Sequence, residues 1–145
     1  MAYRIGIDLG GTKIESAVLD SNNNILFRER IFTQSHLGSD HILNQINNIY
    51  KMATKSIKNE AHTLGIASPG SISKKTQLLR NSNTLCLNGL PLKLKIEEKL
   101  GKKIAIENDA NCFSLAEASL GAGKEYSCVF GVIMGTGCGG GFVFN

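Results

Sequence analysis

A glycine pair followed by threonine and lysine stands near the start of the chain, in the stretch IGIDLGGTKIESAVLD. Gly10 and Gly11 allow a sharp bend that turns backbone N–H groups inward, and such a concave bend binds anions without a helix. Thr12 and Lys13 would add a hydroxyl and a cation for a phosphoryl group, while Asp8 would hold a hydrated Mg²⁺ beside it. A tight hairpin also favours glycine, so a plain turn is an equally open interpretation of this motif alone.

Two commoner nucleotide-binding loops are excluded by their sequence context. A P-loop needs Ser or Thr after its lysine and then a helix, whereas strand-like sequence follows Lys13. The stretch GTGCGGG contains the dinucleotide-binding spacing, but another strand rather than a helix follows it. What remains is a second strand–loop–strand unit, whose candidates for contact with a phosphate are Gly135, Thr136, Gly137 and Gly139.

A carboxylate stands between these two loops, in the stretch IENDANC. Asp109 lies where a strand is expected to give way to a helix, and there it could accept the proton of a hydroxyl that attacks a γ-phosphoryl group. Deprotonation is late in such a loose transition state, so an ordinary carboxylate suffices. The alternative is a helix-start acid that complements the helix dipole. Asn108 and Asn111 beside it are of the kind that grips hydroxyl groups.

The elements that position these residues begin with three strands. Short apolar runs at residues 3–8, 14–19 and 25–32 are separated by the glycine bend and by the turn sequence DSNNN, which predicts an antiparallel meander. Helical spacing of apolar residues follows from Ser39, with Ser39 or Asp40 expected as N-cap.

Helices and strands then alternate along the chain. Residues 62–67 predict a strand that ends where Pro69 and Gly70 turn the backbone, and residues 76–90 predict a short strand with a loop. A helix with Pro91 at its first position and Gly101 as its stop precedes a strand at residues 103–107. Asn108 should cap a helix that runs to residue 120, and strands are expected at residues 127–134 and 141–144. This order predicts an α/β fold with a mixed sheet.

Composition excludes several other classes of function. The net charge of +4 comes from scattered lysines with no basic run interleaved with aromatics, which argues against a nucleic-acid partner. The four cysteines form no CxxC pair, which argues against a zinc site or a disulfide framework in this chain. No apolar run approaches the roughly 20 residues that span a bilayer, and no signal peptide is evident, so no membrane partner and a cytoplasmic location are expected.

Four motifs together resemble one known family. GIDLGGTK, SPGSI, NDANC and GTGCGGG, in this order, resemble the ROK family of sugar kinases, and the match runs through essentially the whole chain. The resemblance implies an α/β, ribonuclease-H-like fold of the actin/hexokinase/Hsp70 type, with a mixed sheet flanked by helices. Within the family, SPGSIS, NSNTLCLNGLPL and GTGCGGG look most like bacterial fructokinases (manno-fructokinases).

The resemblance also implies a role for each candidate residue. Asp109 would be the catalytic base of an ATP- and Mg²⁺-dependent hexose kinase, and Asn108 would hold a sugar hydroxyl. Gly70, Ser71 and Asn83 would line the sugar pocket. The two glycine loops, at residues 8–13 and 135–139, would face the ATP phosphates from opposite sides. Fructose, phosphorylated at its 6-hydroxyl, is the expected substrate, with glucose, mannose or N-acetylglucosamine as alternatives.

Family members are about twice as long, so the resemblance covers only their first half. Residues 1–122 would form the sugar- and phosphate-binding lobe, and residues 123–145 the opening hairpin of a second, nucleotide-binding lobe. A structural zinc site and most of the adenosine pocket would lie beyond Asn145, and the full-length form is expected to be a homodimer. Two alternatives remain open: a catalytically incomplete sugar-binding fragment, and a sugar-responsive transcriptional regulator. The first strand starts at residue 3, which leaves no room before it for a helix-turn-helix segment.

Overall fold

The first three strands form the antiparallel meander that the sequence predicts. The computed structural model describes residues 3–135 and 137–144, and its strands β1 (Tyr3–Leu9), β2 (Lys13–Leu19) and β3 (Ile25–Phe32) pair in chain order. Alternate residues of β1 are buried, since successive side chains of a strand point to opposite faces. This meander places the glycine bend between β1 and β2 at one edge of the sheet.

Two later strands complete a mixed sheet. Strand β4 (His62–Ser68) lies parallel to β1, and β7 (Ala105–Asn108) follows β4 in the strand order β3-β2-β1-β4-β7. Strands β5 (Ser71–Ile72) and β6 (Leu79–Arg80) form a separate small sheet after the turn at Gly70. Because β1 and β4 are parallel, their carboxyl ends meet at the same edge, where ligands bind in sheets of this kind.

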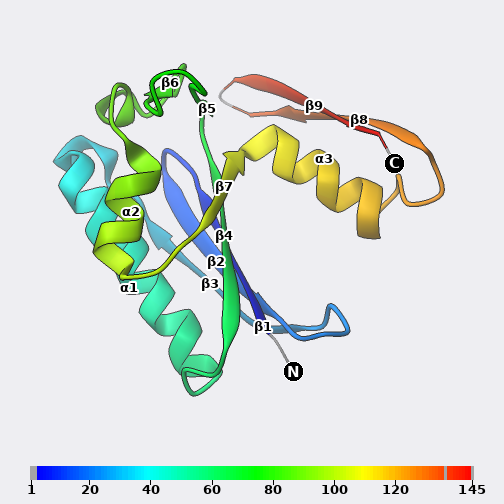
Figure 1. Ribbon diagram of the computed structural model, residues 1–145, viewed down its shortest axis with the longest axis horizontal. Helices are drawn as coiled ribbons and strands as arrows, with labels where there is room; N and C mark the ends of the chain where they lie inside the picture. The colour runs from blue at the N-terminus through cyan, green and yellow to red at the C-terminus, as the bar shows by residue number, and fades with distance from the viewer. Residues whose placement is uncertain (1–2, 136, 145) are drawn as a thin grey trace. The chain divides into compact units, whose positions relative to one another are not determined.

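Two α-helices pack in the first part of the chain (Figure 1). Helix α1 (Ser39–Ser56) buries Ile42, Ile46 and Ile49 against the sheet, and α2 (Leu92–Leu100) packs beside α1. Short 3-10 turns, η1 (Ser35–Leu37) and η2 (Leu85–Leu87), lie in the connections. The apolar spacing that predicted α1 thus faces the core.

Two predicted helix starts were wrong. Gly38, not Ser39 or Asp40, is the N-cap of α1, and at φ 89° and ψ 176° it adopts a backbone conformation that favours glycine. Pro91 is the N-cap of α2 rather than its first residue, because its ψ of 66° is not helical. Gly101 ends α2 at φ 63° and ψ 27°, which confirms the predicted left-handed stop.

The last part of the chain holds a helix and a hairpin. Helix α3 (Asp109–Leu120) packs on strands β8 (Cys128–Met134) and β9 (Cys138–Phe144), which pair with each other. Strand β9 begins earlier than predicted, so Gly139 lies in a strand and not in the glycine loop. A Cβ atom at Gly141 would lie 2.7 Å from Asn111 Oδ1 and 2.8 Å from Ser114 Oγ. Gly139 and Gly141 therefore allow close packing on α3, a contact that the local sequence does not reveal.

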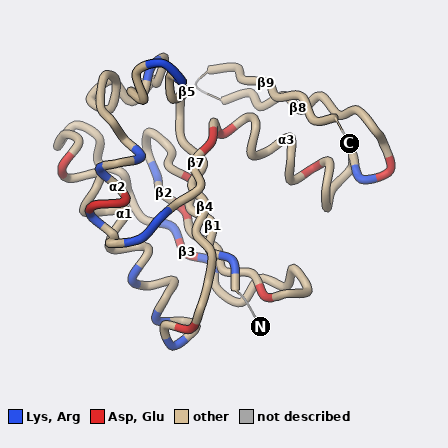
Figure 2. The backbone as a smooth tube through the Cα atoms, in the orientation of Figure 1, with Lys and Arg blue, Asp and Glu red and all other residues tan. Residues whose placement is uncertain are grey.

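The chain divides into two compact units, and the boundary along the sequence lies between Ile106 and Glu107. By packing, α3 belongs with the hairpin in the second unit, whereas the sequence-based boundary was placed at residue 122. That boundary stays a prediction about the domains of a longer protein. Lysine and arginine are scattered over the first unit and do not form one continuous stripe (Figure 2). Among the helices in the described ranges, none is both long and apolar enough to cross a bilayer.

One ion-pair cluster on the sheet gives a pH-dependent prediction. Burial alone would raise the pKa of Glu15, but hydrogen bonds from Arg28 and Arg30 outweigh burial and lower this pKa below its ordinary value of 4.5. Arg28 Nε lies 2.5 Å from Glu15 Oε1. A carboxylate with a lowered pKa stabilises the folded state at neutral pH, and this contribution is lost as the pH falls below 4.5 through the folded pKa.

We therefore expect Glu15→Gln to reduce the loss of unfolding free energy between neutral pH and about pH 3. Urea denaturation at several pH values measures this loss. Glu29→Gln is the matched control, because Glu29 lies on β3 and forms no ion pair with any residue that the structure describes. An unchanged pH dependence in Glu15→Gln would contradict the prediction.

Candidate functional site

Three hydrogen bonds hold the bend between β1 and β2. The Gly10 N–H donates to the Lys13 carbonyl at 3.0 Å, the Thr33 hydroxyl donates to the Gly10 carbonyl at 2.7 Å, and the Thr33 N–H donates to the Thr12 carbonyl at 2.8 Å. Within the described residues, the N–H groups of Gly11 and Thr12 donate to no acceptor. The bend thus keeps two neighbouring backbone donors available to a bound anion.

Asp8 and Lys13 lie in the strands on either side of this bend. Asp8 is exposed near the carboxyl end of β1, directly opposite Glu15 of β2 and Ala67 of β4. Lys13 is the first residue of β2, and its ammonium group lies 5.9 Å from the centre of the Phe32 ring. Both charges therefore flank the bend.

Asp8 is the predicted metal ligand at this edge of the sheet. No three His, Cys, Asp or Glu side chains in the part of the chain that the structure describes are grouped to hold a metal ion. Mg²⁺ is commonly held by one or two carboxylates together with phosphate oxygens and water. The exposed carboxylate of Asp8 meets that limited demand, and it would contact the ion through water as the sequence predicts.

The predicted sugar-binding residues of the first unit converge on one segment, residues 80–84. A Cβ atom on Gly70, which has φ 76°, would lie 2.4 Å from the Arg80 carbonyl oxygen and 2.8 Å from the Ser82 nitrogen. A Cβ atom on Gly11 would lie 4.0 Å from Asn83 Oδ1. The segment therefore contacts Gly70 and the glycine bend, and Ser71 follows Gly70 directly in β5. The structure thus brings Gly70, Gly11 and Asn83 together.

Asn88 braces this segment and was missed by the sequence analysis. Its Oδ1 accepts from the Ser82 N–H and its Nδ2 donates to the Ser82 carbonyl, both at 2.9 Å. Gly89, at φ 79°, follows it. The pair Asn-Gly after a short apolar turn was the available signal, but its partner lies six residues back. Asn88 thus fixes the loop that carries Asn83.

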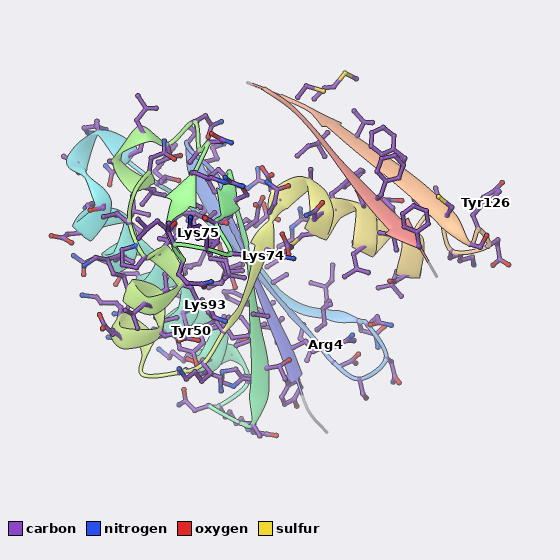
Figure 3. All side chains as sticks on the ribbon, turned by 45° about the horizontal axis from the view of Figure 1, so that its top comes forward. Arg4, Tyr50, Lys74, Lys75, Lys93 and Tyr126 are labelled. Atoms are coloured by element: carbon purple, nitrogen blue, oxygen red, sulfur yellow. The ribbon has the colours of Figure 1, made fainter. Side chains whose placement is uncertain are left out.

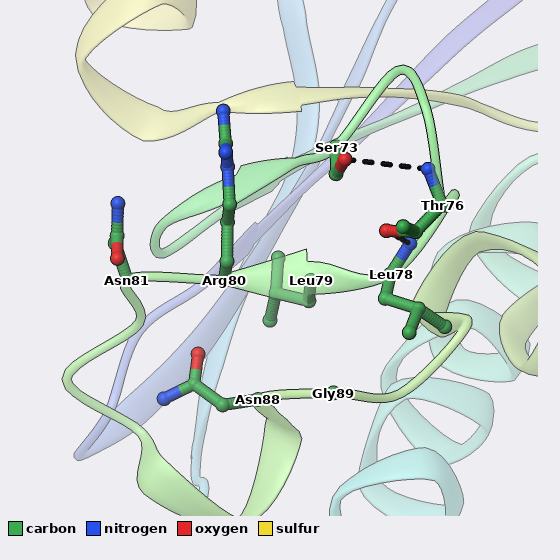
Figure 4. A pocket seen from close by; sticks show the side chains of 8 residues that line it. All are labelled: Ser73, Thr76, Leu78, Leu79, Arg80, Asn81, Asn88 and Gly89. Carbon is green, nitrogen blue, oxygen red and sulfur yellow. Dashed lines mark hydrogen bonds between the residues drawn. The ribbon is translucent and has the colours of Figure 1, made fainter.

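A hollow of about 600 Å³ adjoins this brace. Its lining is mixed polar and apolar, and Figure 4 shows its residues, Ser73, Thr76, Leu78, Leu79, Arg80, Asn81, Asn88 and Gly89. Lys74 and Lys75, labelled in Figure 3, lie in the turn between β5 and β6. The polar side chains of the hollow are partly used within the loop, since Ser73 Oγ accepts from the Thr76 N–H. None of the predicted site residues lines it.

In the second unit, Asp109 is held at the first position of α3. Asn108 Oδ1 accepts from the N–H groups of Ala110 at 3.0 Å and Asn111 at 3.4 Å, which confirms it as N-cap. Asn108 Nδ2 donates to Asp109 Oδ1 at 2.9 Å, and the Ala110 N–H donates to the same oxygen at 2.8 Å. Asp109 Oδ2 accepts no hydrogen bond from the described residues. One carboxylate oxygen is fixed and the other can accept a proton.

Asn108 contacts Asp109 directly, and Glu107 contacts Asn108 and Asn111. Glu107 Oε1 accepts from the Asn108 N–H at 2.8 Å and from Asn111 Nδ2 at 3.1 Å. Glu107 was not singled out from the sequence, where it reads as the end of a strand. Contact of Asn108 with a sugar hydroxyl stays a prediction, and the structure adds a positioning role for it.

The second glycine loop is shorter than the sequence analysis supposed. The Gly135 N–H donates to the Gly137 carbonyl at 2.8 Å, and a Cβ atom on either glycine would meet nothing within 4 Å. Gly139, in β9, would bring a Cβ atom to 3.1 Å from Ala110 Cβ. Thr136 lies outside the described residues. The loop is thus open at Gly135 and Gly137, whereas Gly139 has a packing reason to be glycine.

The family is decided by comparison with known proteins. The model of the ROK family matches residues 4–145. The chain belongs to the ROK family. An N-acetyl-D-glucosamine kinase from Histophilus somni is 38% identical over 140 residues, which cover 97% of this ROK chain and 45% of that protein. The chain therefore spans about half the length of the curated relatives it matches.

Solved structures agree with this assignment. A ROK family glucokinase from Streptomyces griseus, in complex with glucose and AMPPNP, superimposes with a TM-score of 0.87 at 29% identity, over 99% of this ROK chain and 45% of that one. A ROK family transcriptional regulator, a homologue of the E. coli MLC protein, gives 0.80 at 17% identity over 98% of this chain and 36% of that one, a likeness of fold alone. The predicted fold class, ribonuclease-H-like with a mixed sheet flanked by helices, is confirmed.

Proposed function

We propose that the protein carrying this chain transfers the γ-phosphoryl group of ATP to a hydroxyl of a hexose or an N-acetylhexosamine. Family membership supports a sugar kinase, and the similar proteins are named for N-acetyl-D-glucosamine and for glucose. The motif likeness to fructokinases had favoured fructose, and none of these relatives supports that narrower choice. The proposal therefore covers the class of sugar, and fructose is one member of the test panel.

The observation that carries the proposal is the braced bend with two unused N–H groups. Gly11 and Thr12 offer their N–H groups at the edge where β1 and β4 end, and residues 80–84 adjoin them. An anion-binding loop beside a polar segment suits a reaction between a phosphate ester and a polyhydroxyl compound. In a purely structural hairpin these two N–H groups would donate only to water.

The residues around the transferred phosphoryl group have distinct chemical tasks. Asp109 Oδ2 accepts the proton of the sugar hydroxyl while its oxygen forms a bond to the γ-phosphorus, and the bond from that phosphorus to the bridging oxygen breaks, so that ADP leaves. Asn108 holds Asp109 Oδ1, which fixes the direction of Oδ2. Gly11, Thr12 and Lys13 bind phosphoryl oxygens.

The remaining residues hold the two substrates. Gly70, Ser71 and Asn83 contact the sugar, and Asn108 adds a hydrogen bond to one of its hydroxyls. Gly135, Thr136 and Gly137 bind phosphate from the second loop, with Gly139 supporting that loop from β9. Asp8 would hold Mg²⁺ through water, and the ion would supply positive charge to offset the negative charge of the phosphates. Most of the catalysis is then positioning and charge neutralisation, as is usual for phosphoryl transfer.

A panel of sugars tests the proposal. ADP release by the complete protein is measured by a coupled assay with N-acetylglucosamine, glucose, mannose and fructose, and with no sugar as control. We expect release that depends on at least one of these sugars. The same assay on this chain alone shows whether the chain is sufficient for phosphoryl transfer or is catalytically incomplete. Absence of sugar-dependent ADP release from the complete protein with every sugar would contradict the proposal.

A further inference from the structure

One buried hydroxyl in the first unit has no hydrogen-bond partner in the part of the chain that the structure describes. Thr84 is 4% exposed, and its Oγ1 atom makes no hydrogen bond with any residue that the structure describes. Buried polar atoms are nearly always paired, because a group removed from water loses the hydrogen bonds it made there. The buried hydroxyls of Thr33 and Ser114, in contrast, each donate to a backbone carbonyl at 2.7 Å. The unpaired hydroxyl of Thr84 therefore calls for an explanation.

Thr84 faces the glycine bend from the neighbouring segment. A Cβ atom on Gly11 would lie 3.3 Å from Thr84 Oγ1, so the hydroxyl is close to the Gly11 backbone. The Thr84 backbone is itself held, since its N–H donates to Ser82 Oγ and its carbonyl accepts from the Leu87 N–H, both at 3.0 Å. A fixed backbone thus keeps the unpaired hydroxyl beside the part of the bend that carries unused N–H groups.

The Gly11 carbonyl is the natural acceptor for this hydroxyl. Among the residues that the structure describes, none donates a hydrogen bond to that carbonyl. In a planar trans peptide, the carbonyl of one residue and the N–H of the next point in opposite directions. A hydrogen bond that draws the Gly11 carbonyl toward Thr84 would therefore turn the Thr12 N–H away from Thr84, toward an anion in the bend.

We propose that Thr84 is a positioning residue for the anion-binding bend: on binding of the ATP phosphates, its hydroxyl donates to the Gly11 carbonyl and fixes the peptide that presents the Thr12 N–H. The inference rests on the proposed function and adds a link between the sugar-contacting segment and the phosphate-contacting bend. Valine would fill the same space without an unpaired hydroxyl. The unpaired hydroxyl thus lowers the stability of the free protein, and the hydrogen bond formed on binding offsets this loss.

Three variants of the complete protein test this role. Thr84→Val removes the hydroxyl, Thr84→Ser keeps it, and Thr33→Val removes a hydroxyl that is already paired. Calorimetry gives the Kd of ATP and of inorganic tripolyphosphate, urea denaturation gives stability without ligand, and steady-state kinetics separates the KM for ATP from the KM for sugar. We expect Thr84→Val to be at least as stable as the wild type and to bind both polyanions about two- to tenfold more weakly, the range of one neutral hydrogen bond. Thr84→Ser should bind as the wild type does.

The contrast with Thr33 separates positioning from structure. Thr33→Val should lower stability, because it leaves the Gly10 carbonyl without its donor. The KM for sugar should be unchanged in Thr84→Val while the KM for ATP rises. Any one of three results would overturn the inference alone. Thr84→Val could bind tripolyphosphate as tightly as the wild type, or it could be less stable than the wild type. Thr84→Ser could also fail to restore the polyanion affinity. A wild type that binds neither ATP nor tripolyphosphate would overturn the proposed function and this inference with it.

Discussion

Asp109→Asn in the complete protein is expected to lower kcat by about 10²–10⁴-fold, the usual contribution of a general base. The amide matches the carboxylate in size and keeps the oxygen that accepts from the Ala110 N–H. It loses the ability to take a proton from the sugar hydroxyl. Sugar affinity, measured by calorimetry beside the kinetic assay, should therefore stay close to that of the wild type while turnover falls.

Asp40→Asn is the matched control for this variant. Asp40 and Asp109 both lie in the first turn of an α-helix, where a carboxylate stabilises the helix dipole by about 0.3–1 kcal/mol. If Asp109 served only the dipole, the two variants would lose similar stability and neither would lose turnover. Near-normal kcat in Asp109→Asn, with folding comparable to Asp40→Asn, would remove Asp109 from the mechanism.

Gly70→Ala is expected to lower the free energy of unfolding by about 3 kcal/mol or more. Two effects add at this position. A left-handed backbone at φ 76° costs an alanine about 1–2 kcal/mol. The new Cβ atom would also lie 2.4 Å from the Arg80 carbonyl oxygen, a backbone atom that can move only if the segment carrying Asn83 moves with it. Sugar affinity should fall together with stability.

Gly101→Ala isolates the first of these effects. Gly101 has φ 63° at the end of α2, and a Cβ atom there would meet nothing within 4 Å. Urea denaturation of both variants should therefore show a smaller loss for Gly101→Ala, about 1–2 kcal/mol. Equal losses in the two variants would mean that residues 80–82 are not packed against Gly70 as described.

Local signals predicted much of the fold. The turn DSNNN and the apolar runs around it define the meander, and Asn108 is a cap because its side-chain oxygen reaches N–H groups only two and three residues ahead. The failures at Gly38 and Pro91 are one-residue shifts, since polar and proline residues near a helix start are compatible with more than one position.

Contacts between distant residues account for what the sequence did not predict. Thr33 braces Gly10 from 23 residues away, and nothing in the local sequence that follows β3 marks it. Gly139 was predicted to lie in a loop because glycine is typical of turns, yet it lies in β9 where a Cβ atom would be 3.1 Å from Ala110 Cβ of α3. The local sequence of Thr84 is that of a polar loop, and only the fold buries its Oγ1 atom without a hydrogen-bond partner among the described residues.

The most direct test of the account is the response of two backbone amides to phosphate. Amide ¹H–¹⁵N spectra of the complete protein would be recorded with ATP, with inorganic tripolyphosphate and with adenosine. Because Gly11 and Thr12 are proposed to donate to phosphoryl oxygens, their resonances should shift with ATP and tripolyphosphate and stay in place with adenosine. ATP binding that leaves both resonances unchanged would contradict the claim that this bend holds phosphate.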